Sequence, residues 1–147
     1  MTTRADIVSV AREYLGTPFH HRGRTPGVAL DCAGVVICAA RELGIFAPQF
    51  DVTNYTGSPD GTMMLLCDQY MTRILKSEME SGDVVALITD KDGTREQHLG
   101  ILADYRHGGL SLIHASNDRL HKAVIETRLM FSRNFRFAGA WRFPGID

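Results

Sequence analysis

One cysteine of this sequence lies where it could act as a nucleophile. Cys32 follows Asp31 at the start of an apolar run that ends at Gly44, so it is expected in the first turn of a helix. The unpaired N–H groups and the positive end of the helix dipole lie there, and both favour a thiolate over a thiol. The same N–H groups can stabilise the oxyanion of an acyl-transfer reaction. These features predict that Cys32 is an activated nucleophile.

The other two cysteines, Cys38 and Cys67, lie inside apolar helical stripes, which is typical of core residues. Three cysteines without a CxxC spacing indicate neither a disulfide framework nor a cysteine-rich zinc site. All three are therefore expected to be free thiols in a reducing compartment.

A nucleophilic thiol needs a base that titrates near neutral pH, and histidine is the usual one. His98 and His114 each lie at one end of an apolar strand, in HLGILA and LIHAS. A hairpin of HLGILA and LSLIHA around the loop DYRHG would pair Leu102 with Leu110 and His98 with His114. The two rings would then be cross-strand neighbours, with Cβ atoms about 5 Å apart. The remaining histidines lie in polar segments expected at the surface: His20, His21, His107 and His121.

The elements that must position these residues are helical in the first half of the chain and extended in the second. Helices are predicted after the cap Thr3, from Asp31 to about Leu43, and from Pro59 to about Met71 with Ser58 as cap. Strands are predicted over 83–88, 98–103, 110–115, 120–126 and 135–143. Helices followed by strands predict an α+β domain, 1–147, with the central helix packed on an antiparallel sheet of about five strands.

The composition excludes several classes of protein. The 147 residues carry a net charge of −1, with no basic block that would indicate a nucleic-acid partner. The apolar runs are too short for membrane insertion. The N-terminus lacks the pattern of a secretory signal peptide, so the protein is expected to be cytoplasmic as synthesised.

These features together resemble the NlpC family of papain-like cell-wall cysteine peptidases, over nearly the whole chain and in the same order. YLGTPFHHRG is similar to the opening segment of the family, and LDCAG to its nucleophile motif Asp-Cys-Ser-Gly. SGDVVAL resembles its first strand, QHLGIL its histidine strand, LIHAS the strand with a third polar residue, and FAGAWRF its last strand.

The resemblance implies a papain-like NlpC-type fold and assigns roles to single residues. Cys32 would be the nucleophile, His98 the general base and acid, and His114 the residue that orients His98. Asp31 would cap the helix and also meet the free amine of the substrate. The family commonly has a tyrosine where this chain has Phe19, so either His20 beside it supplies the missing hydrogen-bond donor or that donor is absent. Ala33 replaces the usual serine.

The implied activity is that of an endopeptidase acting on the stem peptide of bacterial peptidoglycan, at the bond between γ-linked D-glutamate and the diamino acid. The chain is also similar to short members encoded beside phage tail genes, which implies phage tail proteins as partners and delivery in a tail. The alternatives are another papain-like amidase or peptidase, and a non-catalytic tail or wall-contact protein of the same fold. A zinc site of Cys32, His98 and His114 is a further alternative, but the thiol at a helix N-terminus favours chemistry without a metal or cofactor.

Overall fold

Helices precede strands along the chain, which confirms the α+β prediction. The structure, a computed structural model, describes residues 1–55, 61–89 and 98–147. Its helices are α1 (Arg4–Glu13), α2 (Cys32–Glu42), α3 (Thr62–Tyr70) and the short 3-10 helix η1 (Lys76–Glu78). Its strands are β1 (Arg24–Thr25), β2 (Ala29–Leu30), β3 (Thr72–Ile74), β4 (Val84–Ile88), β5 (His98–Asp104), β6 (Leu110–Ala115), β7 (Val124–Arg128) and β8 (Arg136–Arg142).

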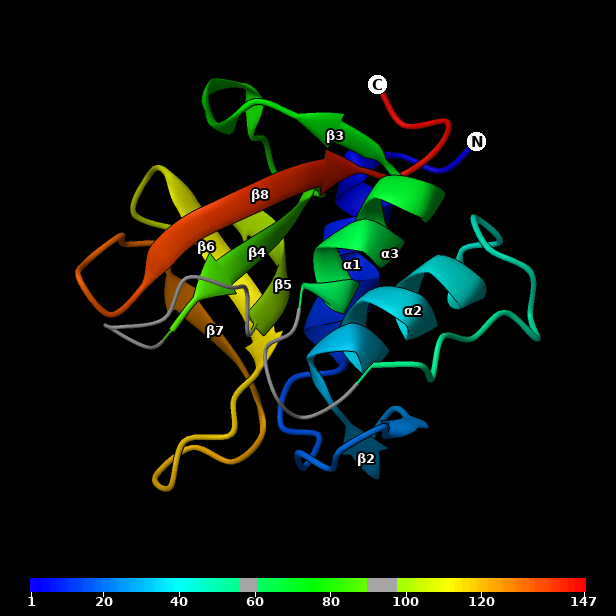
Figure 1. Ribbon diagram of the computed structural model, residues 1–147, viewed down its shortest axis with the longest axis horizontal. Helices are drawn as coiled ribbons and strands as arrows, with labels where there is room; N and C mark the ends of the chain where they lie inside the picture. Colours follow the sequence, from blue (N-terminus) through cyan, green and yellow to red (C-terminus); the bar gives the residue numbers. More distant parts are fainter. Residues whose placement is uncertain (56–60, 90–97) are drawn as a thin grey trace.

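A six-stranded antiparallel sheet contains most of the second half of the chain, in the order β3-β8-β4-β5-β6-β7. The five predicted strands are β4 to β8, although β7 begins later than the sequence predicts. Strand β3 was not predicted, because three residues are too few to show an alternating pattern. β1 and β2 form a separate two-stranded ribbon next to α2. The three helices lie together beside the sheet (Figure 1).

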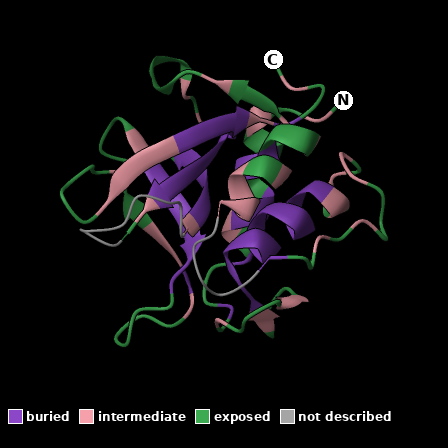
Figure 2. Cartoon of the chain, viewed as in Figure 1, coloured by how far each residue is buried: buried purple, intermediate pink, exposed green. Residues whose placement is uncertain are grey.

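The main core fills the space between the helices and the sheet. Strand β5 shows how the two faces of the sheet differ: Leu99 and Ile101 belong to the cluster shared with the helices. Leu102 belongs to a second cluster with Val85 and Leu112 on the other face. α2 and the central strands are buried, whereas much of α3 is exposed (Figure 2).

Helix α2 has the boundaries that the sequence predicts. The Asp31 side chain caps it by accepting a hydrogen bond from the Gly34 N–H at 2.7 Å, and Gly44 follows its end with φ 72°. Nine consecutive residues, from Cys32 to Ala40, are buried, because the helix packs on α1, on β5 and on the β1–β2 ribbon. The N-terminus of this helix is therefore held inside the protein.

The other two helices are also present. Thr3 and Asp6 form a capping box at the start of α1, as the cap prediction requires. α3 begins at Thr62 after Gly61, whereas the predicted cap Ser58 and first-turn Pro59 lie outside the described residues. Within those residues, none of the helices is long and apolar enough to cross a membrane.

The hairpin of β5 and β6 corrects the predicted register. Leu102 pairs with Leu112 and not with Leu110, which is a shift of two residues. The reason is the loop, which covers residues 105–109: Gly109 has φ 78° and so belongs to the turn and not to the strand.

The shift changes how the two strand histidines meet. Because it is an even number of residues, it leaves the side chains of His98 and His114 on the same face of the hairpin. Continuation of the ladder past its last pair, Ile101 with Ile113, puts Gly100 opposite His114. The two histidines are therefore diagonal neighbours and not a direct cross-strand pair.

Candidate active site

The N-terminus of α2 is organised around one buried carboxylate. Asp31 is 2% exposed and accepts four hydrogen bonds. Its donors are the N–H groups of Gly34 and Arg22, the guanidinium of Arg24 and the hydroxyl of Tyr55, at 2.6 to 2.9 Å. Arg24 and Tyr55 also contact each other at 2.6 Å. This carboxylate therefore holds the first turn of α2 in place, and its predicted contact with a substrate amine stays a prediction.

Replacement of Asp31 by alanine should lower the free energy of unfolding by about 3 kcal/mol, because it removes the helix cap and leaves the partly buried Arg24 without one of its two carboxylate partners. Asp51 is the matched control: its side chain is more exposed and contacts the same guanidinium at 2.9 Å. Asp51→Ala should cost about 1 kcal/mol or less. Urea unfolding of both variants measures the difference, and equal losses would contradict the central role of Asp31.

The sulfur of Cys32 lies in a buried position in the first turn of α2, with the residue 9% exposed. Backbone N–H groups of Cys32, Ala33 and Leu99 are directed at it and favour the thiolate. Burial, together with the negative charge of Asp31, has the opposite effect and is stronger, so the pKa of Cys32 is raised to about 11. The prediction of a lowered thiol pKa is therefore wrong, because the effect of desolvation on the pKa is larger than that of the helix N-terminus.

Alkylation of Cys32 by iodoacetamide should be slow at pH 7 and should accelerate up to about pH 11. The thiolate is the reactive form, and below a raised pKa its fraction grows about tenfold for each pH unit. Mass spectrometry of the digested protein measures the rate at Cys32 alone. A rate that is already maximal at pH 7 would show that the thiolate is stable in the free protein.

His98 and His114 form a chain of hydrogen bonds that extends to a third residue. His98 Nε2 lies 2.6 Å from His114 Nδ1, and His114 Nε2 lies 3.2 Å from the Thr127 hydroxyl on β7. The pKa of His98 is lowered to about 3 by burial and by the neighbouring imidazole, and that of His114 to about 4 by burial. Both rings are therefore neutral at physiological pH.

A base at His98 would use its other nitrogen, Nδ1. That requires the proton of neutral His98 on Nε2, which then donates to Nδ1 of His114. His114 in turn carries its proton on Nε2 and donates it to the Thr127 hydroxyl. The chain therefore allows the tautomer in which Nδ1 of His98 is free to accept a proton. Thr127 was not predicted from the sequence, because only the pairing of β6 with β7 brings it near His114.

One backbone group links Cys32 to the strand that carries His98. Leu99, whose N–H faces the Cys32 sulfur, is the residue directly after His98. In the part of the chain that the structure describes, neither imidazole forms a hydrogen bond with the sulfur. Proton transfer between Cys32 and His98 therefore requires a contact that is absent here, and such contacts often tighten only when substrate binds.

Phe19 and His20, the two site residues predicted in the loop before α2, do not contact the candidate nucleophile. The Phe19 ring is partly buried and packs on the main core, while its N–H donates to the Lys122 carbonyl. His20 is exposed, and among the described residues its side chain forms no hydrogen bond. No described contact brings either side chain to the Cys32 sulfur. The hydroxyl that contacts the helix cap Asp31 is that of Tyr55, which the sequence alone did not single out.

The zinc alternative lacks its ligand set in the described residues. No group of three or more histidine, cysteine, aspartate or glutamate side chains there has the arrangement of a metal site. Two of the supposed ligand nitrogens, on His98 and His114, instead bond to each other. All three cysteines are free thiols.

Comparison with known proteins gives a family match over most of the chain. A model of the NlpC/P60 family matches residues 16–138. The chain has no match among curated protein sequences.

Solved structures show the same fold at low sequence identity. NlpC1 from Trichomonas vaginalis superposes with a TM-score of 0.70 at 18% identity, over 97% of this chain and 45% of that chain. The NlpC/p60 domain of the peptidoglycan hydrolase SagA gives 0.63 at 20% identity, over 95% and 98%. An N-acetylmuramoyl-L-alanine amidase from Bacteroides uniformis gives 0.58 at 14% identity, over 95% and 98%. The chain thus spans less than half the length of NlpC1.

Proposed function

The chain belongs to the NlpC/P60 family, and from this we propose that it is a cysteine hydrolase that cleaves the stem peptide of bacterial peptidoglycan. One observation carries the proposal: three N–H groups are directed at a thiol at a helix N-terminus, and one of them belongs to Leu99, the residue after His98 of the hydrogen-bonded histidine pair. This is the combination of nucleophile, oriented base and backbone donors that acyl transfer requires. The bond between γ-linked D-glutamate and the diamino acid is the proposed cleavage point.

The proposed reaction has two steps. Cys32 gives its proton to Nδ1 of His98 as its sulfur attacks the carbonyl carbon, and the N–H of Cys32 stabilises the oxyanion. The C–N bond breaks when His98 passes the proton to the departing amine, which leaves a thioester. His98 then removes a proton from water, the resulting hydroxide attacks the thioester, and the proton returns to the sulfur.

The neutral state of the three groups fits this sequence of proton transfers. The raised pKa of Cys32 and the lowered pKa of His98 keep the proton on the sulfur in the free protein. The nucleophile would then form only when the thiol and the imidazole come into contact, so that the thiolate and the imidazolium stabilise each other. His114 and Thr127 would hold the His98 ring and its tautomer throughout.

Digestion of purified sacculi tests the substrate and the bond together. Mass spectrometry should find fragments that end in D-glutamate and fragments that begin with the diamino acid, their summed mass larger by one water than the parent. Peptides released intact from the sugar would instead identify an amidase and would contradict the proposed bond. Phage tail partners and delivery in a tail stay predictions from the sequence resemblance.

A further inference from the structure

The carboxylate of Asp31 already has a donor at each of its acceptor positions. Its Oδ1 accepts hydrogen bonds from the Gly34 N–H and the Arg24 guanidinium. Its Oδ2 accepts from the Arg22 N–H and the Tyr55 hydroxyl. An ionised carboxylate offers about four lone-pair positions, so these donors fill them. A free amine of the substrate, which the sequence resemblance predicts as a partner of Asp31, would have to displace one of these donors.

The Arg24 guanidinium is fixed in its place on Asp31. All of its N–H donors are used at 2.6 to 3.0 Å, and its acceptors besides Asp31 are the Asp51 carboxylate, the Tyr55 hydroxyl and the carbonyls of Gly23 and Val52. Its side chain is 12% exposed, and that of Asp31 is 3% exposed. Breaking a buried ion pair by removing one partner is costly. An ammonium that arrives from water is therefore not expected to replace this guanidinium.

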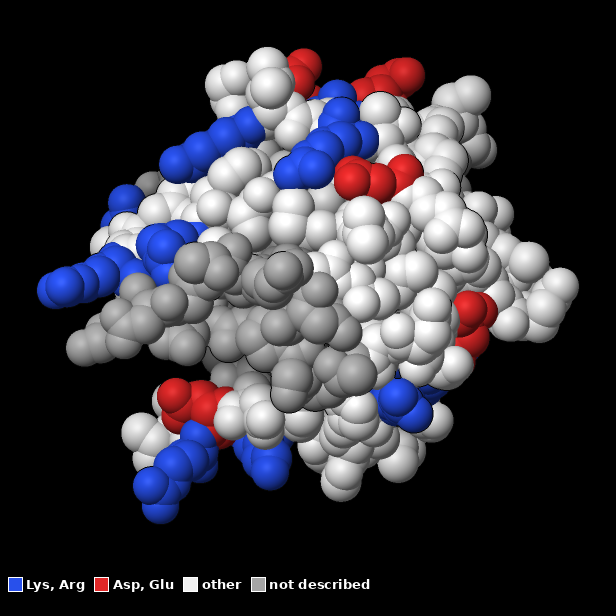
Figure 3. Space-filling model, viewed as in Figure 1, with Lys and Arg blue, Asp and Glu red and all other residues white. Residues whose placement is uncertain are grey.

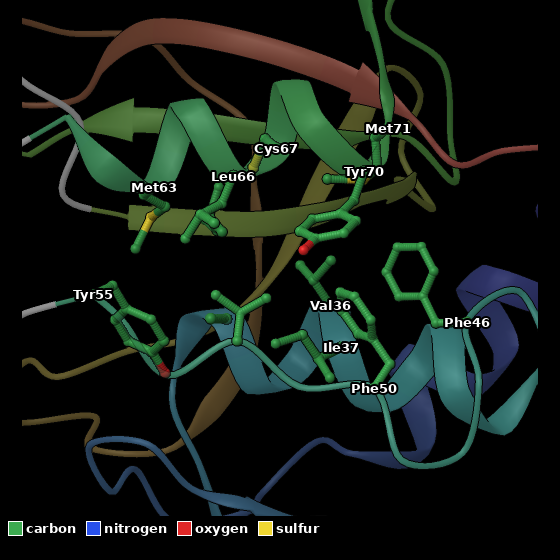
Figure 4. Close-up of a pocket in the computed structure, with 13 residues that line it drawn as sticks. Val36, Ile37, Phe46, Phe50, Tyr55, Met63, Leu66, Cys67, Tyr70 and Met71 are labelled. Carbon is green, nitrogen blue, oxygen red and sulfur yellow. The ribbon is translucent and has the colours of Figure 1, made fainter.

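Tyr55 covers the other oxygen of the carboxylate. The residue is 5% exposed, and its hydroxyl donates to Oδ2 of Asp31 at 2.6 Å. Its ring lines one end of the apolar groove between α2 and α3, and its hydroxyl is directed away from α3 (Figure 4). The tyrosine ring therefore lies between this groove and Asp31.

The charge next to Tyr55 is positive. The exposed Arg22 donates to the Tyr55 carbonyl at 3.1 Å, and its guanidinium lies 6.0 Å from the centre of the tyrosine ring. None of the ion pairs among the described residues includes Arg22. The visible surface over α2 and α3 is largely uncharged (Figure 3). A substrate amine at this end of α2 therefore meets a cation and not an available carboxylate.

Asp31 directly precedes Cys32, so its contacts bear on the part of the substrate before the cleaved bond. In the proposed substrate that part is γ-linked D-glutamate preceded by alanine, whose amine is joined to the sugar in the intact wall. We propose that Arg24 and Tyr55 make this chain accept the acylated alanine, because they occupy the carboxylate that would bind a free amine. This inference rests on the proposed function and adds that the substrate is a stem peptide still attached to its sugar.

Calorimetric titration of the Cys32→Ala protein measures this specificity without cleavage. The ligands are alanyl-γ-D-glutamyl peptides with diaminopimelate or lysine as third residue, each with a free or an acetylated N-terminal amine. The dissociation constants of the two forms should agree within about threefold or favour the acetylated form, since the ammonium gains no partner on Asp31. A free form that binds more than about threefold tighter would overturn the inference. Failure of the acetylated peptides to bind would overturn it as well.

Tyr55→Ala and Tyr70→Ala, both on the Cys32→Ala background, provide a matched pair. Both tyrosines line the groove, but the Tyr70 hydroxyl accepts from Gln69 at 3.3 Å, whereas that of Tyr55 donates to Asp31. Loss of the Tyr55 side chain opens Oδ2 of Asp31, so the free form should then bind about tenfold tighter than the acetylated form. Tyr70→Ala should keep the ratio of its background. An unchanged ratio in a folded Tyr55→Ala protein would contradict the role of Tyr55.

Cleavage of the same peptides by the wild-type protein distinguishes a failure of the specificity from a failure of the proposed function. Binding of both forms without release of the diamino acid would contradict the hydrolase but support the proposed specificity. Release from the free form alone would support the hydrolase and overturn the specificity. The titration of the two forms needs only the Cys32→Ala background, so its result holds even if Tyr55→Ala does not fold.

Discussion

Replacement of Cys32 by alanine should lower peptide release from purified sacculi by at least about 1000-fold, because no other described group near His98 can form the acyl-enzyme. Stability should hardly change. The first turn of α2 accepts alanine, and Asp31 still caps the helix through the Gly34 N–H. The loss should be about 1 kcal/mol or less, which corresponds to a few degrees in Tm for a domain of this size.

Cys38 is the matched control for this substitution. It lies on the same helix, is equally buried, and its thiol contacts the Arg24 carbonyl at 3.4 Å. Cys38→Ala should therefore remain active, with a comparable effect on Tm. If Cys32→Ala releases wall peptides as fast as wild type does, the hydrolase is excluded. The non-catalytic wall-contact protein of the same fold then becomes the better explanation.

Substitutions along the histidine chain should produce a graded loss of activity. His98→Ala removes the base and should match the loss at Cys32. His114→Gln retains a side-chain acceptor for His98 Nε2 and should leave partial activity, about 10- to 100-fold below wild type. Thr127→Val removes only the outermost contact, 3.2 Å from His114, and should cost about tenfold or less. Rates of peptide release, compared at equal folded fraction, measure the series.

The exposed His121 is the control for nonspecific effects of histidine loss, and His121→Ala should be fully active. A His114→Gln protein as inactive as His98→Ala would contradict a purely orienting role for His114. A His98→Ala protein that keeps most of its activity would exclude His98 as the base. Chelators should change none of these rates, and inhibition by them would favour the zinc alternative.

Local sequence signals were sufficient for the elements that carry the candidate site. The helix around Cys32 follows from the cap Asp31, the apolar run and Gly44, all within fifteen residues. The strands around His98 and His114 follow from the alternation of apolar and polar side chains. The two histidine side chains still lie on the same face of the hairpin, because the error in the predicted register is two residues. The error arose because the sequence alone did not assign Gly109 to the turn, where its positive φ excludes it from the strand.

The partners of these residues come from distant parts of the chain, and no local pattern predicts them. Tyr55 reaches Asp31 across 24 positions, and Thr127 reaches His114 through the pairing of β7 with β6. Nothing in the sequence near Tyr55 or Thr127 distinguishes their hydroxyls from other surface hydroxyls. Only the packed structure shows which hydroxyls have a buried acceptor or imidazole within hydrogen-bond distance.

The protonation state of Cys32 and the two histidines shows most clearly how a prediction from local sequence can differ from the result of tertiary packing. From the sequence alone, Cys32 lies at a helix N-terminus, and that local position stabilises a thiolate. The tertiary structure buries the sulfur beside Asp31 and the imidazoles beside each other, which raises the pKa of Cys32 and lowers those of His98 and His114. Helix position is encoded by a few adjacent residues, whereas desolvation depends on every element packed around the group. The sequence therefore determined which residues could react, and the tertiary structure decided which of their protonation states is stable.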